Sequence, residues 1–128
     1  MKQLLLAILF SSFAFSKITV ISKYHELSKI TQQELANLYL KKSNTLNGIK
    51  VIPIDSKDKK LFQEFYRKLI KENPKQLHAY WIKEIYRGDK QPPKKLSPQV
   101  LKKVMKNKTP IVSYVKNPKT GKILLTIK

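Results

Sequence analysis

The chain has 128 residues, and its 27 lysines and arginines against 8 aspartates and glutamates give a formal net charge of +19. This length allows one domain with a modest core and is too short for two lobes with a cleft between them. The sequence contains no cysteine, which excludes disulfides and thiolate metal sites. The charge balance favours acidic partners such as anions, nucleic acid or anionic lipid.

The first sixteen residues have the layout of a cleavable secretory signal. Lys2 gives a positive start, an apolar run begins at Leu4, and Ala14 and Ser16 are small residues near its end. The run is shorter than the roughly 20 apolar residues of a membrane-spanning helix. We therefore expect cleavage near Ser16/Lys17 and a single mature domain, residues 17–128, without a membrane span.

The basic residues are spread along the whole chain, and only Arg67 and Arg87 are arginines. Specific recognition of phosphate or nucleic acid usually depends on the forked guanidinium group of arginine. The scarcity of arginine argues against a nucleic-acid partner. A lysine-rich solvated surface set by compositional bias is the competing explanation for the charge.

Strands and helices are predicted to alternate along the mature chain. Residues 18–21 form a β-branched run that predicts a buried strand. Thr31 and Glu34 form a capping box, which predicts a helix that runs to about Leu40. Residues 49–54 predict a second buried strand.

The second half of the chain continues this alternation. The predicted elements are a helix capped by 55–58, a helix from Pro74 to Arg87-Gly88, a loop over 89–96, a helix from Ser97-Pro98, and strands over 111–115 and 123–127. We expect the last two strands to form a hairpin. The fold class is therefore α/β, a mixed sheet of about four strands with about four packing helices.

Five motifs follow one another in a specific order. They are T-x-x-E-L-x-x-L-Y-L over 31–40, L-N-G-I over 46–49, V-I-P-I-D over 51–55, P-x-Q-x-x-x-Y-W over 74–81, and T-P-I-V-S-Y-V over 109–115. Their order resembles the phosphate-binding proteins of ABC transporters. The resemblance implies a single small lobe of a type II periplasmic-binding-protein-like (PBP-like) fold, located in the periplasm.

One stretch departs from that family. Its phosphate-gripping motif R-x-D-x-S-G-T corresponds here to I-D-S-K-D-K-K over 54–60, with no arginine and no Ser-Gly-Thr triplet. The resemblance therefore carries the fold and not the phosphate affinity. The class of ligand that it implies is still phosphate or another oxyanion, bound weakly, and the partner that it implies is an ABC permease, a sensor or a second copy of the chain.

The best candidate site is the start of the helix after this stretch, because a helix N-terminus attracts an oxyanion. The candidate ligand-binding residues are Ser56, Lys57, Lys59, Lys60 and Tyr114. The alternative is a helix capped by Asp58 with a solvated lysine face, with Tyr114 packed in the core.

Little in the sequence points to catalysis. His25 and His78 are far apart in the sequence and lack partners at ligand or triad spacing, so we expect no enzyme, no metal and no cofactor. The predicted function is that of a periplasmic solute-binding-type protein that binds phosphate or another oxyanion weakly, for transport or sensing. The alternatives are an accessory or interaction protein that has lost the ligand, and a basic polyanion-binding protein.

Overall fold

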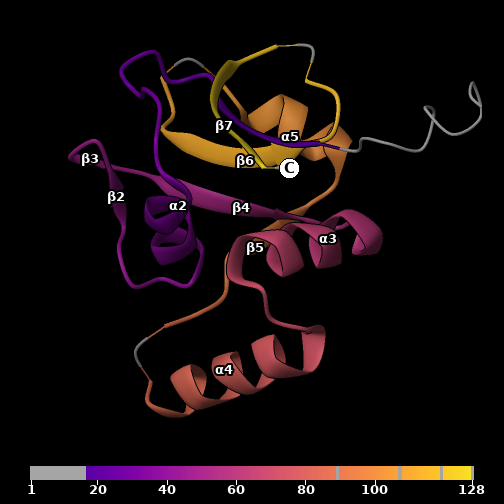
Figure 1. Ribbon diagram of the computed structural model, residues 1–128. Helices are drawn as coiled ribbons and strands as arrows, with labels where there is room; N and C mark the ends of the chain where they lie inside the picture. The colour runs from indigo at the N-terminus through magenta and orange to yellow at the C-terminus, as the bar shows by residue number, and fades with distance from the viewer. Residues whose placement is uncertain (1–16, 89, 107, 119, 128) are drawn as a thin grey trace, which may run out of the picture.

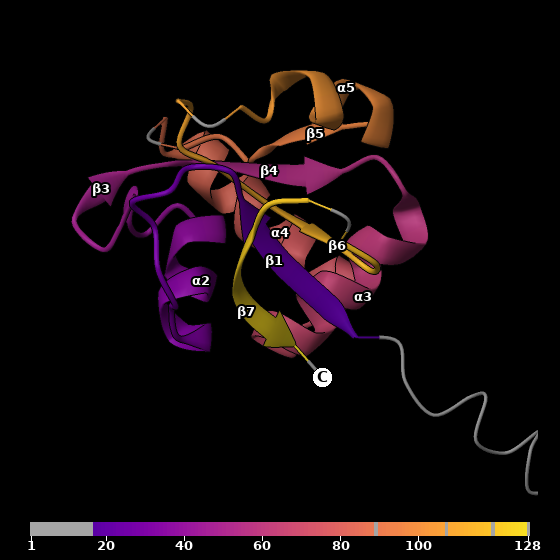
Figure 2. The same ribbon diagram turned by 90° about the horizontal axis from the view of Figure 1, so that it is seen from above.

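The structure is a computed structural model that describes residues 17–88, 90–106, 108–118 and 120–127. The predicted signal segment, residues 1–16, lies outside these ranges. The described chain forms one mixed α/β domain in which helices cover both faces of a central sheet (Figure 1). Figure 2 shows α5 on the opposite side of the sheet from α2 and α3.

Five strands form the sheet. They are β1 (Ile18–Ser22), β4 (Ile52–Ser56), β5 (Lys94–Leu96), β6 (Ile111–Val115) and β7 (Lys122–Ile127), in the order β5-β4-β6-β1-β7. β4 pairs in parallel with β5 and β6, whereas β1 is antiparallel to both β6 and β7. β1 therefore runs against four strands that share one direction. The short strands β2 (Thr45–Leu46) and β3 (Ile49–Lys50) form a separate hairpin.

The predicted hairpin of the last two strands is wrong, because β1 lies between β6 and β7. All five residues of β1 are buried, and a strand with this pattern is best placed in the interior of a sheet, with a neighbour on each side. The predicted loop over 89–96 also needs correction, since β5 occupies its last three residues. The pattern of apolar residues did not predict β5, because Lys94 and Lys95 are charged. Charged residues are typical of an edge strand.

Each of the four described helices begins at a polar cap. The helices are α2 (Gln32–Tyr39), α3 (Lys59–Ile70), α4 (Pro74–Tyr86) and α5 (Pro98–Val104). The predicted capping box is confirmed: the Glu34 amide donates to Thr31 Oγ1, and the Thr31 amide donates to the Glu34 carboxylate. Asp58 caps α3 as predicted, since one of its carboxylate oxygens accepts from the Lys60 and Leu61 amides.

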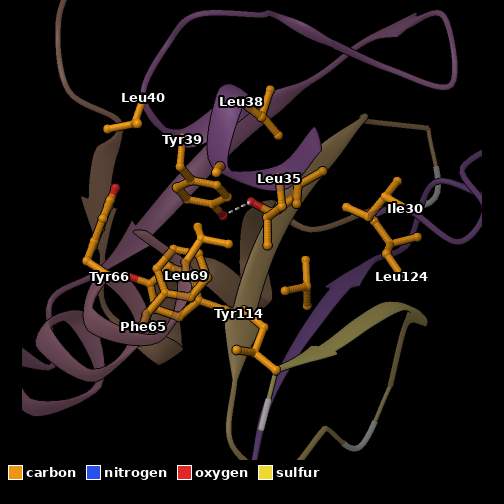
Figure 3. Packing of buried hydrophobic residues seen from close by; sticks show 14 of the residues in the cluster. Ile30, Leu35, Leu38, Tyr39, Leu40, Phe65, Tyr66, Leu69, Tyr114 and Leu124 are labelled. Carbon is orange, nitrogen blue, oxygen red and sulfur yellow. Dashed lines mark hydrogen bonds between the residues drawn. The ribbon is translucent and has the colours of Figure 1, made fainter. Parts of the chain in front are cut away.

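The core consists of two clusters, one on each face of the sheet. The larger cluster joins the sheet to α2, α3 and α4 and includes Trp81, which confirms its predicted place in the core. Tyr39, Phe65, Tyr66 and Tyr114 gather within it, between α2, α3 and the sheet (Figure 3). The smaller cluster lies under α5 and is built from Ile21, Ile54, Met105 and Ile111.

A tyrosine hydroxyl links β4 and β6 beyond their paired residues. The parallel register joins Ile52 to Ile111 and Pro53 to Val112. Further along, the buried Tyr39 hydroxyl lies 3.0 Å from the Ile54 carbonyl oxygen and 3.1 Å from that of Val112, so its single proton serves both acceptors. Tyr39 therefore fixes the spacing of the two strands as they approach their carboxyl ends.

We expect Tyr39→Phe to lower the free energy of unfolding by about 1–3 kcal/mol, because two buried carbonyl oxygens lose their donor. Urea unfolding followed by circular dichroism would measure this loss. The matched control is Tyr24→Phe, whose hydroxyl donates to Glu26 at an exposed position and whose removal should change stability by less than about 0.5 kcal/mol. Equal losses in the two variants would contradict the role given to Tyr39.

Candidate functional site

The strand order reverses where β4 and β6 lie side by side. From β4 the chain passes through α3 and α4 to β5 on one side, and it later returns through α5 to place β6 on the other side. Open α/β sheets bind ligands outside the carboxyl ends of the strands at such a reversal. The ends in question here are Ser56 of β4 and Val115 of β6.

A cavity of about 380 Å³ lies at this edge, between α5 and the sheet. Its walls are mostly apolar, and Ile21, Leu101 and Met105 contribute to them. Its polar lining residues include Asp55, Ser56, Ser113, Tyr114, Asn117 and Thr120, together with the basic Lys23 and Lys102. The cavity thus combines an apolar wall with a small polar group and two positive charges.

Asp55 is the centre of the polar group. Its side chain accepts a hydrogen bond from the Tyr66 hydroxyl at 2.8 Å and one from the Tyr114 hydroxyl at 2.9 Å. The Tyr114 oxygen in turn accepts from the Ser56 amide at 3.1 Å. This chain of hydrogen bonds holds together the last residues of β4, the middle of α3 and the end of β6.

The environment of Asp55 favours its protonated form. The residue is only 2% exposed, and burial raises the pKa of its carboxyl group from 3.8 to about 7. The hydrogen bonds from Tyr66 and Tyr114 and the charges of Lys95 and Lys41 lower the pKa and offset part of this rise. Near neutral pH both protonation states of Asp55 are therefore populated.

Aromatic packing fixes the position of Tyr114. The Phe65 ring stacks on the Tyr114 ring with centroids 3.7 Å apart and planes inclined by 6°. Tyr39 meets both rings edge-on.

Burial, followed by the charge of Asp55, raises the pKa of the Tyr39, Tyr66 and Tyr114 hydroxyls. The three hydroxyls consequently stay protonated and act as donors at physiological pH.

The structure brings together two of the five residues predicted as ligand contacts. Ser56 and Tyr114 are hydrogen-bonded to each other, and both line the cavity. Lys57, Lys59 and Lys60 are exposed and are not among the residues that line it. Lys57 and Lys59 instead border a second groove, between α3 and α4.

Most amides at the start of α3 already have acceptors within the chain. Asp58 accepts from Lys60 and Leu61 at 3.0 and 3.2 Å, Ser56 Oγ accepts from the Asp58 amide at 3.0 Å, and the Lys57 amide donates to the Leu96 carbonyl. An oxyanion at this turn would have to compete with these acceptors. Anion binding there stays a prediction, and the structure adds the neighbouring cavity as a second place for a ligand.

Sequence reasoning missed the partnership of Asp55 with Tyr66 and Tyr114. An acidic residue at the end of the apolar run Ile-Pro-Ile-Asp was the available signal, because a buried carboxyl group needs hydrogen-bond partners.

The predicted surface positions of His25 and His78 are confirmed, since both are exposed. In the described part of the chain, no cluster of three or more His, Asp or Glu side chains could hold a metal ion. Within the same residues, no helix has the length and apolar character needed to cross a membrane.

Comparisons of the chain with protein-family models, with curated proteins and with solved structures found no match. None of these comparisons points to an enzymatic activity. The relationship to phosphate-binding proteins therefore remains a prediction from the order of the sequence motifs.

Proposed function

We propose that the chain is an exported, single-lobe solute-binding-type protein, related to the phosphate-binding proteins of ABC transporters, that binds a small anion. The observation that carries the proposal is the cavity at the reversal of the strand order, where Asp55, Ser56 and Tyr114 form one hydrogen-bonded group. The motif order, and a mixed sheet in which β1 opposes four parallel strands, support the PBP-like fold assignment. Export rests on the sequence of residues 1–16, and the periplasm as the destination rests on the resemblance to phosphate-binding proteins.

The lining of the cavity narrows the chemistry of the ligand. Lys23 and Lys102 attract a carboxylate or phosphate group, whereas Ile21, Leu101 and Met105 present an apolar wall. Ligand sites of this kind combine an apolar lining with a few orienting polar groups. An organic anion with an apolar part fits this lining better than a bare inorganic ion does, although phosphate and sulfate belong in the same experiment.

A single lobe leaves one side of the ligand open to solvent. Tight binding of a small ligand needs burial on several sides, so we propose weak binding by the isolated chain. A permease, a sensor or a second copy of the chain would supply the missing wall. This arrangement fits transport or sensing, in which the ligand passes from one protein to another.

NMR titration of ¹⁵N-labelled protein, residues 17–128, tests the proposal. We expect millimolar phenyl phosphate or benzoate to shift the amide signals of Ser56, Tyr114 and Val115, with smaller shifts for phosphate and sulfate. Lys102→Gln should weaken binding by about 2–5-fold, because an ion pair with one exposed charge contributes little. Lys103→Gln is the matched control, since Lys103 is the exposed neighbour on α5 and is not among the residues that line the cavity. The absence of shifts around the cavity with all four anions would refute anion binding there.

A second candidate function is that of an accessory or interaction protein that has kept the fold and lost the ligand. The specific observation in its favour is that Asp58 and Ser56 already satisfy the amides at the start of α3. A titration without shifts, together with an intact fold, would favour this second function.

A further inference from the structure

Helix α4 lies at one end of the molecule, beyond α3 and away from the sheet (Figure 1). The buried side chains of Leu77 and Trp81 attach it to the core, and the Tyr80 hydroxyl donates to the Leu40 carbonyl at 2.7 Å. Its other side carries Ile82, Ile85 and Tyr86, which are 55%, 44% and 92% exposed. Positions i, i+3 and i+4 lie together on a helix, so these three side chains form one apolar stripe open to solvent.

A groove runs beside this stripe. It has a volume of about 870 Å³ and is bordered by α3, α4 and the segment that carries Pro92 and Pro93. Phe62 and Trp81 line it from the core side, and Ile82 and Ile85 line it along α4. The apolar surface is therefore continuous from the core, through the groove, to the exposed stripe.

Basic residues surround this apolar surface. Lys57, Lys59 and Lys95 line the groove, and Lys75, Lys83 and Arg87 lie along the outer face of α4. Among the described residues that line the groove, Asp55 is the one acidic residue, and its carboxyl group is buried and bound to two tyrosines. Within α4, all of which is described, Glu84 is the single carboxylate; it is buried and paired with Arg87 and Lys90 at 3.7 and 3.6 Å. The surface thus offers positive charge beside apolar contacts.

We propose that the groove along α4 is the docking site for an amphipathic helix of a partner protein that carries acidic residues beside its apolar face. Such helices bind in grooves through apolar side chains at i, i+3, i+4 and i+7. The 13 residues of α4 span about 20 Å at 1.5 Å per residue, which matches three to four turns of a partner helix. Acidic side chains flanking those turns would face Lys57, Lys59 and Lys95 on one side and Lys75, Lys83 and Arg87 on the other.

Two other occupants fit the surface less well. A second copy would place the basic residues of one α4 against those of the other, and like charges at an interface oppose association. An anionic lipid surface would attract the same charges, but a flat bilayer cannot follow the concave part of the surface that Phe62 and Trp81 line. The concave shape and the charge together favour a helix.

Selection from a displayed library of 16-residue helical peptides, with apolar and charged positions randomised, tests the proposal. We expect the enriched peptides to be acidic and to change the fluorescence of Trp81, the single tryptophan of the chain, because Trp81 lines the groove. The double variant Ile82→Ser/Tyr86→Ser should weaken their binding at least tenfold. Ile123→Ser is the matched control, since Ile123 is 51% exposed on β7, outside the groove.

Three results would overturn the proposal. The first is a selection that yields no peptide, or peptides without acidic residues, or peptides whose binding is equal in the variant and the control. The second is preferential binding of vesicles that contain phosphatidylglycerol, with loss of that binding in the double variant. The third is a dimer in sedimentation that the double variant dissociates. The anion titration is separate from all three, so failure of either proposal leaves the other standing.

Discussion

Phe65→Ala is expected to lower the free energy of unfolding by about 3–5 kcal/mol, the usual loss for a buried phenylalanine. Phe65 is fully buried and lies against Tyr114 with ring centroids 3.7 Å apart, and it also meets Tyr39 and Tyr66 within 5.2 Å. Small domains have only about 5–15 kcal/mol of stability in total. Urea unfolding at neutral pH would show a midpoint shifted to much lower urea.

Phe62→Ala is the matched control, because it makes the same chemical change one helical turn earlier, at a half-buried position. Its loss should lie near the lower end of the roughly 0.5–3 kcal/mol range of ordinary substitutions. Phe65→Ala should also disturb the Tyr114–Asp55 hydrogen bond, which the NMR signals of Ser56 and Tyr114 would report. Equal losses in the two variants would contradict the central place of Phe65 in the core.

Local structure could be predicted from the sequence because its causes are local. Thr31 and Glu34 are three residues apart, and their side chains can satisfy each other's amides without help from the rest of the chain. The same holds for Asp58 at the start of α3. The strand order depends instead on pairing between segments that are far apart in the sequence. The turn signals after Val115 were compatible with a hairpin, although β6 and β7 do not pair. The burial of every β1 residue favours a place in the interior of the sheet, and in the structure that place is between β6 and β7.

The candidate site was predictable in part for the same reason. Ser56 belongs to the stretch 55–58 that the sequence marked as the start of a helix, and Tyr114 shares one face of a predicted strand with Val112. Tyr66 belongs to α3 and reaches Asp55 only when α3 packs across the end of β4. The lysines marked by their charge remain at the surface, because an ammonium group is strongly hydrated and nothing within the fold needs to remove it from water. The charged residues in the sequence therefore indicated roughly where the site lies, whereas the packing of the fold determined which residues form it.

The stability of the wild-type protein, relative to that of Asp55→Asn, should fall as the pH rises from about 4 to about 7. Burial, the largest influence, raises the folded-state pKa of Asp55 to about 7, against 3.8 for an unperturbed group. Between these values the folded state holds a proton that the unfolded state has released, so rising pH favours unfolding. A difference of about three pKa units corresponds to roughly 4 kcal/mol. The contribution is fully present below about pH 4 and is lost once the pH passes about 7.

Urea unfolding of both proteins, from about pH 4 to about pH 8, measures this effect as a difference of two free energies. Because the two proteins share every other titrating group, the repulsion among the lysines largely cancels in that difference.

Asp58→Asn is the matched control: Asp58 is exposed, and asparagine caps a helix about as well as aspartate does. A constant difference for Asp55→Asn over the same range would mean that Asp55 ionises as a solvated carboxyl group. The hydrogen bonds from Tyr66 and Tyr114 and the nearby lysine charges would then offset the effect of burial, and a carboxylate that is charged at neutral pH beside the cavity would repel the proposed anion.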